Sequence, residues 1–193
     1  MPRAADLKEV DIRSRADWRD WLLAHHQQTE SIWLVRWKKH TAHHVEHDEI
    51  VEEALCWGWI DSAVRKKDDD RSLLLLSPRK PTSAWSAVNK AHVARAEAAG
   101  RMQPPGRALI EAAKANGMWN FLDDVERLEV PEDLAAAFTA HPPAAEEWEA
   151  FPRSAKRGIL EWIKTAKRAE TRAKRIAETA TLAAKGERAN QFR

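Results

Sequence analysis

The chain contains no Tyr, only one Cys and only six Gly among its 193 residues. The single cysteine, Cys56, excludes an internal disulfide, and its apolar neighbours Leu55 and Trp57 predict a small buried side chain rather than a reactive thiol. The glycines are not grouped as phosphate-cradling loops require, and no GxSxG, Walker or dinucleotide fingerprint occurs. The sequence therefore shows none of the common catalytic loops.

Long apolar runs are missing as well. No segment approaches the roughly 18 consecutive apolar residues of a membrane-spanning helix. Residues 1–18 are charged throughout and lack the apolar core of a secretory signal. We therefore expect a cytoplasmic protein without a membrane span.

Tryptophan is unusually abundant, with ten residues. Hydrophobic residues make up 44% of the chain and charged residues 32%, which is the balance of a globular protein and not of a disordered one. A chain of 193 residues can bury a core in one domain, or in a medium domain with a small appendage.

Charge is distributed unevenly although the formal net charge is only +2. Residues 1–152 carry 20 basic and 26 acidic side chains, whereas residues 153–193 carry 12 basic and 4 acidic ones. A basic C-terminal segment can attract phosphates, anionic lipid or an acidic partner. It can equally neutralise the acidic remainder of its own fold, and we favour this second interpretation.

Hydrophobic periodicity predicts the secondary structure. Trp18, Trp21, Leu22 and His25 are spaced as one apolar face of a helix that begins at an Asp17 N-cap. Alternating and β-branched residues predict strands, and prolines near the first turn predict helix starts. The predicted strands are 31–39, 59–67 and 71–80, and the predicted helices are 17–27, 47–58, 82–100, 107–117 and the runs that open at Pro131, Pro142 and Pro152, the last reaching residue 186.

These elements predict an α+β fold, in which a small antiparallel sheet packs with helices and an all-helical C-terminal unit follows. The last two strands should form a hairpin around an Asp-rich connection and share one sheet with the first strand. We expect a domain of residues 1–128 and a helical basic module of residues 129–193, joined by a linker at 128–131.

Four histidines, His40, His43, His44 and His47, lie within eight residues of one another. Neutral imidazoles beside carboxylates are competent ligands for zinc or nickel. However, HExxH and paired CxxC elements are absent, and the segment is predicted to be a polar loop between a strand and a helix. We therefore expect no metal site and no cofactor.

Indoles and polar side chains meet at one end of the predicted sheet. Indoles offer a large rigid contact area, and Arg offers a planar fork for carboxylate or phosphate, so this end is predicted to capture a ligand or peptide. The predicted ligand-binding residues are Trp59, Asp61, Arg79, Ser83, Trp85, Ser86 and Asn89. The alternative is that the indoles fill the core, where Trp is common, and that Asp61 and Arg79 form an ordinary ion pair.

Basic residues recur at helical spacing near the C-terminus. Lys164, Arg168, Arg172 and Arg175 follow one another by four, four and three residues along the last predicted helix, with Lys167 beside them. These five side chains are the candidate anion-binding or nucleic-acid-binding residues. The alternative is a solvated face, or one paired with acids of the same chain.

Three segments together resemble the bacterial YdeI/OmpD-associated family, also known as bacteriocin-protection proteins. They are VEEALCWGWIDS (51–62), SPRKPTSAWSAVNK (77–90) and ILEWIKTAKRAETRAKRI (159–176), and the resemblance extends from Asp17 to Gly186. It implies an N-terminal α+β module that looks like a domain of unknown function, sometimes called iron-chaperone or frataxin-like, and a helical C-terminal module. The chain departs from the family pattern at Trp57, where Phe is usual, and at His47, where Tyr is usual.

The resemblance marks family positions in each segment but no established catalytic residue. It marks Glu53, Cys56, Gly58, Trp59, Ile60 and Asp61, then Arg79, Ser83, Trp85, Ser86 and Asn89, and finally Lys167, Arg168, Glu170, Thr171, Arg172 and Arg175. The family labels imply a role in tolerance to antimicrobial peptides or envelope stress.

The leading hypothesis is a non-enzymatic cytoplasmic protein of stress or bacteriocin tolerance that binds an unidentified protein or small molecule. The alternative is a nucleic-acid-associated protein that uses the basic C-terminal helix. A third hypothesis is an enzyme built around Asp61, Arg79 and Ser83. The oligomeric state cannot be read from the sequence.

Overall fold

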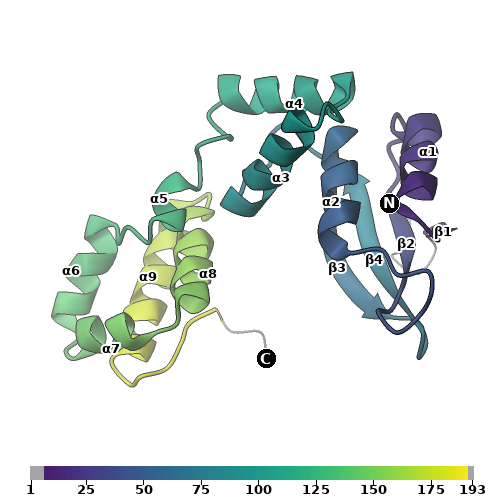
Figure 1. Cartoon of the computed structure of the whole chain (residues 1–193). Coiled ribbons are helices and arrows are strands. Elements are labelled where there is room, and N and C mark those ends of the chain that lie inside the picture. The colour runs from purple at the N-terminus through teal and green to yellow at the C-terminus, as the bar shows by residue number, and fades with distance from the viewer. Residues whose placement is uncertain (1–6, 191–193) are drawn as a thin grey trace. The chain divides into compact units, whose positions relative to one another are not determined.

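The computed structural model describes residues 7–190 and divides the chain into two compact units, Met1–Phe121 and Leu122–Arg193 (Figure 1). Within residues 7–190, strands occur only in the first unit, and the second unit is built from helices. This confirms the predicted α+β class with C-terminal helices.

The first unit combines four strands with four helices in its described residues. They are β1 (Glu9–Asp11), α1 (Arg15–His25), β2 (Ile32–Trp37), α2 (His47–Cys56), β3 (Trp59–Lys66), β4 (Arg71–Pro78), α3 (Ala87–Ala98) and α4 (Pro104–Ala115). The sheet order is β1-β2-β4-β3. β3, β4 and β2 pair antiparallel as expected, but β1 adds a parallel edge strand, so the sheet is mixed. Three residues are too few for an alternation to be recognised in the sequence.

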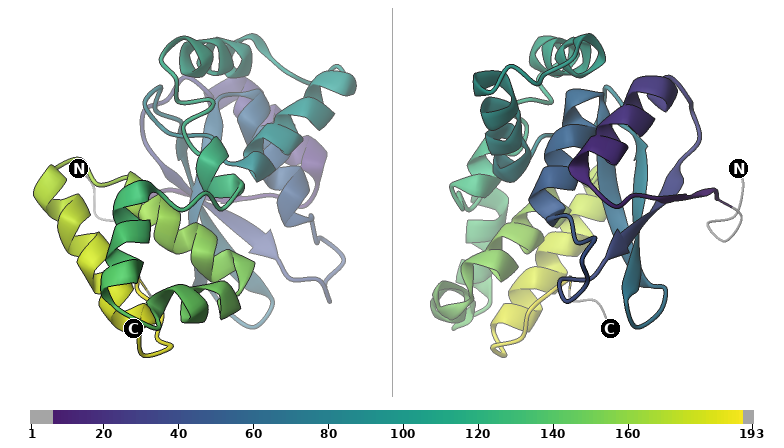
Figure 2. Two further views of the ribbon diagram at one scale, coloured as in Figure 1. Left: turned by 90° about the vertical axis from the view of Figure 1, so that its left-hand side faces the viewer. Right: turned by 45° about the vertical axis from the view of Figure 1, so that its right-hand side comes forward.

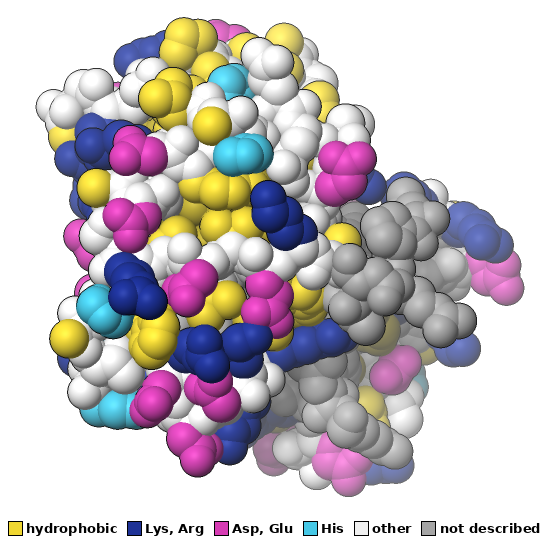
Figure 3. Space-filling view, turned by 90° about the vertical axis from the view of Figure 1, so that its right-hand side faces the viewer, with side chains coloured by type: hydrophobic (Ala, Val, Ile, Leu, Met, Phe, Trp, Pro, Cys, Tyr) yellow, Lys and Arg dark blue, Asp and Glu magenta, His cyan; other side chains and the backbone are white. Residues whose placement is uncertain are grey.

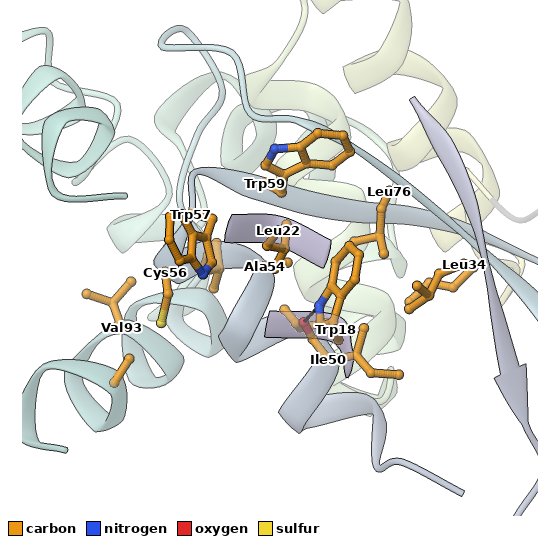
Figure 4. Packing of buried hydrophobic residues seen from close by; sticks show 14 of the residues in the cluster. Trp18, Leu22, Leu34, Ile50, Ala54, Cys56, Trp57, Trp59, Leu76 and Val93 are labelled. Carbon is orange, nitrogen blue, oxygen red and sulfur yellow. Dashed lines mark hydrogen bonds between the residues drawn. The ribbon is translucent and has the colours of Figure 1, made fainter. Parts of the chain in front are cut away.

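One face of the sheet holds the core of the first unit. Side chains alternate across each strand, so Leu34 of β2 and the opposite Leu74 of β4 point to the same face, where both are fully buried. α1 and α2 lie side by side against this face (Figures 1 and 2). From α1, Trp18 enters the core and its Nε1 donates to the carbonyl of Ile50 in α2 at 3.1 Å, the dashed line of Figure 4.

The start of α1 differs from the predicted Asp17 cap. Ser14 is the N-cap, and its hydroxyl accepts the backbone N–H of Asp17 at 3.1 Å. The carboxylate of Asp17 in turn accepts the backbone N–H of Arg13 at 2.9 Å. This reciprocal arrangement is similar to a capping box, and it places the N-cap at Ser14, three residues earlier than the expected Asp17. By contrast, α3 begins later than the predicted start at residue 82, because its N-cap is Ser86.

Two carboxylates on α2 are buried, and both are neutralised by arginines. Glu53 is 1% exposed and receives hydrogen bonds from Arg15 and Arg19 of α1 at 2.8–3.0 Å. Glu52 is 4% exposed and pairs with three arginines, one each from α1, α3 and the segment after α3. Burial opposes the charged form, but these hydrogen bonds outweigh it, so the pKa of each carboxyl lies below its usual value. The network binds α1, α2 and α3 together.

Close approach of the α2 end to α4 depends on glycine. Gly58 ends α2 with a φ of +80°, a conformation that side chains with a Cβ rarely adopt. Gly106 lies in the first turn of α4, where an added Cβ would stand 2.6 Å from the carbonyl oxygen of Leu55 and closer still to that of Cys56. Only hydrogen fits between these backbones.

The second unit contains five helices in its described residues. They are α5 (Asp123–Glu126), α6 (Glu132–Ala140), α7 (Ala144–Ala150), α8 (Arg153–Lys164) and α9 (Ala169–Ala183). The single long helix predicted after Pro152 is wrong, because the chain breaks between Lys164 and Ala169 and turns back as α9. Lys164 and Arg172 therefore lie on different helices, and the basic residues do not form one helical stripe.

Arg175 of α9 stabilises the turn between α8 and α9. The Arg175 guanidinium lies 4.9 Å from the Trp162 ring centre and donates to the Trp162 carbonyl at the end of α8. Cations at a helix C-terminus satisfy free carbonyls and interact favourably with the negative end of the helix dipole.

Between residues 7 and 190, no helix has both the length and the apolar character to cross a bilayer.

Candidate functional site

The predicted indole site on the first unit lies largely within the core. Trp59 is fully buried, packs with its edge on Trp21 at 5.6 Å between ring centres, and donates its Nε1 to the carbonyl of His26 at 3.0 Å. Figure 4 places Trp59 among the core side chains above Leu22. This indole has both its apolar surface and its donor satisfied within the protein.

Arg79 and Trp85 form a stacked pair at the end of β4. The guanidinium carbon lies 3.8 Å from the Trp85 ring centre, and Nη2 donates to the carbonyl of Ala84 at 2.6 Å. Arg79 is 6% exposed, and burial lowers its pKa to about 10. Within residues 7–190 no carboxylate pairs with it, and its buried Nε lacks an acceptor. The arginine therefore binds the loop after β4 through a ring and a carbonyl rather than through an anion.

The remaining polar residues of this predicted site have local roles. Ser86 caps α3 by accepting the backbone N–H of Asn89 at 3.3 Å. The carbonyl of Ser83 accepts a long 3.5 Å hydrogen bond from Arg79. Asp61 lies 3.5 Å from His47, so its partner in the described chain is that histidine and not Arg79. The structure thus brings Arg79, Ser83 and Trp85 together but separates Asp61 from them.

The histidines of the loop between β2 and α2 have separate partners. His40 pairs with Asp70 at 3.0 Å, His44 Nδ1 contacts the Trp37 carbonyl at 2.9 Å, and His43 packs on the Trp37 ring. Across residues 7–190, no three His, Cys, Asp or Glu side chains come together in a way that could hold a metal ion. Burial raises the pKa of the Cys56 thiol to about 12, so it is un-ionised at neutral pH.

Three of the five predicted anion-binding residues have partners in the second unit. Lys164 bonds the carboxylate of Asp124 at 2.5 and 2.6 Å, and Arg172 forms a two-pronged pair with Asp133 at 2.7 and 2.9 Å. Arg175 is used at the α8–α9 corner, as described above. The other two, Lys167 and Arg168, lie exposed in the α8–α9 connection and form no ion pair with any residue between 7 and 190.

A cavity of about 370 Å³ lies beside these pairs in the second unit, and we call it the α5–α8 cavity. Its apolar lining comes from α5, α8 and the turn before α6, and its polar lining combines acids with the two paired cations. The apolar lining residues are Val125, Val130, Pro131, Leu160 and Ile163. The charged lining residues are Asp124, Glu129, Glu132, Lys164 and Arg172.

The acidic side chains that line the α5–α8 cavity outnumber the basic ones, and both basic side chains are already paired with acids. Burial alone would raise the pKa of Asp124, but the hydrogen bond from Lys164 outweighs this, so the pKa of the carboxyl lies below its usual value and Asp124 is ionised at neutral pH. Arg172 is likewise occupied, by Asp133. Glu132 lies exposed in the first turn of α6, and no described residue forms an ion pair with it. Within the described chain, Glu132 is therefore an unpaired carboxylate beside the cavity.

Part of the lining of this cavity follows a pattern that is visible in the sequence. Ile159, Trp162 and Ile163 are spaced as one apolar face of a helix, and Ile163 lines the cavity. Asp124 and Glu132 were not singled out, because acids near the start of a helix are also expected without any binding role. The packing of α5 against α8 places Asp124 beside the apolar floor, and the reversal of the chain after α8 adds Arg172 to the lining.

Two family models match the chain. Residues 10–109 match a domain of unknown function, DUF8412, and residues 127–186 match the family described as bacteriocin-protection, YdeI or OmpD-associated. The second match confirms the family resemblance, over the helical C-terminal residues, whereas the motifs at 51–62 and 77–90 fall in the stretch that matches DUF8412. No curated protein and no solved structure matches the chain.

Proposed function

The chain belongs to the family of the domain of unknown function DUF8412 and carries a segment that matches the bacteriocin-protection family, and on this premise we propose that it is a peptide-binding protein of antimicrobial-peptide tolerance. The proposed ligand is a cationic amphipathic segment, and the proposed site is the α5–α8 cavity. The observation that carries the proposal is the combination of an apolar floor with unneutralised acid in that cavity.

The size and lining of the cavity suit apolar side chains. Its volume of about 370 Å³ lies in the range of ligand pockets, which run from about 300 to 1,000 Å³. Val125, Leu160 and Ile163 are almost fully buried at its floor, so an entering aliphatic group would meet hydrocarbon. Removing apolar area from water contributes roughly 25 cal/mol per Å², which makes such a group the main source of affinity.

Charge at the rim selects the sign of the ligand. Glu132 has no ion-pair partner in the described chain, and Glu129 pairs with Arg127 at the exposed surface, where water screens the attraction. A lysine or arginine near the bound apolar group would therefore find a carboxylate. Antimicrobial peptides combine these two features, because one face is apolar and the other is rich in Lys and Arg.

Fluorescence anisotropy of a labelled amphipathic peptide of Lys and Leu at helical spacing tests the proposal. The wild-type chain should bind it, and a scrambled peptide of the same composition should bind at least about tenfold more weakly. Glu132→Lys should weaken binding by about tenfold or more. Glu178→Lys is the matched control, because Glu178 is exposed on α9, outside the cavity, and undergoes the same change of charge.

Equal losses in Glu132→Lys and Glu178→Lys would mean that only the net charge of the protein matters, and this result would contradict the proposed site. Val130→Trp gives an independent check, because it fills the rim of the cavity from a half-buried turn position. Retention of full affinity by this variant would also contradict the proposal.

Nucleic-acid binding remains the alternative because Lys167 and Arg168 are exposed without ion pairs in the described chain. The other predicted cations are neutralised, and on the face shown in Figure 3 basic and acidic side chains are interspersed. Oligonucleotide affinity that falls steeply between about 50 and 200 mM salt, and that is lost in Lys167→Glu and Arg168→Glu, would favour this alternative.

A further inference from the structure

A second cavity adjoins the α5–α8 cavity through a shared residue. It has a volume of about 390 Å³, and we call it the α6–α9 cavity because α6 with its C-cap and α9 form its walls. Ala137 faces it from α6, and Ala173 and Ile176 face it from α9, so its lining is mainly apolar. Arg172 lines both cavities.

The Arg172–Asp133 pair stands where the two cavities meet. Nε and Nη2 of Arg172 bond the two carboxylate oxygens of Asp133 at 2.7 and 2.9 Å, while Nη1 makes only a long 3.5 Å contact with the Ile163 carbonyl. Both side chains are partly open to water, with 31% and 48% exposed. Partly exposed ion pairs contribute little net free energy, so this pair can be exchanged for another at small cost.

From these contacts, and resting on the proposed peptide-binding function, we infer that the two cavities are subsites of one groove for an amphipathic peptide. One apolar side chain enters each cavity, and a peptide lysine or arginine between them replaces Arg172 at Asp133. A helical peptide meets this requirement because side chains three or four residues apart lie on one face. The exchange keeps the carboxylate of Asp133 paired, and the displaced guanidinium of Arg172, whose side chain is 31% exposed, is solvated by water.

If the two cavities form one groove, a peptide with two apolar side chains should bind more tightly than a peptide with one. One labelled peptide carries two Leu four residues apart with Lys between them, and a second peptide has one of these Leu replaced by Ser. Wild-type protein should bind the first peptide at least about tenfold more tightly, since the second peptide lacks one leucine side chain that would be buried in a cavity. Ala173→Leu, which fills the α6–α9 cavity, should reduce the affinity for the first peptide to that for the second.

Ala136→Leu is the matched control, because Ala136 is exposed on α6 and lines neither cavity. It should leave both affinities unchanged. If the two peptides bind equally well and Ala173→Leu changes nothing, while Glu132→Lys still weakens both, the single groove is overturned and the proposed function stands. If neither peptide binds the wild-type protein, the proposed function and the groove are overturned together.

The replacement of Arg172 by a peptide cation at Asp133 can be tested separately with two variants. Asp133→Asn removes the acceptor of the peptide cation and should weaken binding of the two-Leu peptide, whereas Arg172→Gln removes the competing cation and should strengthen it. Thermal melts of both variants check that the second unit remains folded. A change in the same direction in both variants would show that the pair only separates the cavities, which would overturn the exchange.

Discussion

The guanidinium carbon of Arg79 lies 3.8 Å from the ring centre of Trp85, and the arginine is 94% buried without a carboxylate partner in the described chain. Stacking of a delocalised cation on an indole face offsets part of its desolvation, and a contact of this kind is worth about 2 kcal/mol when buried. Because the Nη2 of Arg79 also bonds the Ala84 carbonyl, the pair fixes the loop that leads into α3.

Arg79→Lys tests that relationship. Lysine keeps the charge but has neither a planar fork nor a stacking surface, so we expect the free energy of unfolding to fall by about 1–3 kcal/mol. Lys80→Arg, at the exposed neighbouring position, should change it by less than about 0.5 kcal/mol. Urea unfolding followed by tryptophan fluorescence measures both, since eight of the ten tryptophans lie in the first unit. An unchanged midpoint for Arg79→Lys would contradict the structural role.

Gly106→Ala tests the contact between α2 and α4. The new Cβ would stand 2.6 Å from the Leu55 carbonyl oxygen, inside van der Waals contact with backbone that cannot rotate away. We expect a loss of about 2–3 kcal/mol from overpacking. Gly158→Ala is the control, because an added Cβ there meets nothing within 4 Å and Ala favours a helix by up to about 1 kcal/mol. Equal melting temperatures of the two variants would contradict the predicted clash.

Glu53→Gln tests the buried network on α2. The amide keeps the shape of the side chain but removes the charge that neutralises Arg15 and Arg19, so the free energy of unfolding should fall by about 2–3 kcal/mol. Glu49→Gln serves as the control because the Glu49 side chain is 44% exposed and its contact with Arg15, at 3.8 Å, is long and weak. Its effect should stay below about 0.5 kcal/mol. Comparable losses in both variants would show that burial adds nothing to the network.

Stability below neutral pH should depend on His92. Burial and the neighbouring Arg95 lower its pKa, so the folded protein holds the ring neutral where the unfolded chain already binds a proton. Stability is therefore complete above the ordinary histidine pKa of about 6.5 and is lost as the pH falls toward the lower folded value. In His92→Gln, the decline in unfolding free energy between pH 7 and pH 5.5 should be shallower than in wild type.

His43→Gln is the control for this measurement, because His43 is only half-buried against Trp37 and no charged partner faces it in the described chain. Urea midpoints at several pH values report the slope for each variant. An identical slope in wild type and His92→Gln would rule out His92 as the titrating group.

The order and type of most elements could be predicted because their signals are local. Period-two alternation in 31–39 and the polar connection before β4 predict a strand and a hairpin, and both are present. Two features lacked such signals. β1 has only three residues, and the α8–α9 break is flanked by good helix formers, so propensity favours continuing the helix there.

The candidate site was less predictable. Indoles and arginines at one end of the sheet suggested ligand capture, but the same residue types also stabilise a core, and sequence does not distinguish an open indole from a buried one. The two cavities of the second unit depend on ion pairs such as Arg172 with Asp133, whose members are 39 residues apart in the sequence. No short window of sequence contains both partners.

The sequence by itself determined the α+β class, the helical C-terminal part, the absence of disulfides and the uneven distribution of charge, because these follow from composition and from periodicities within a few turns. The tertiary structure decided which tryptophans are buried, which cations are neutralised and where acids meet an apolar floor. These outcomes depend on how distant segments pack, and packing chooses among partners that are chemically alike along the chain.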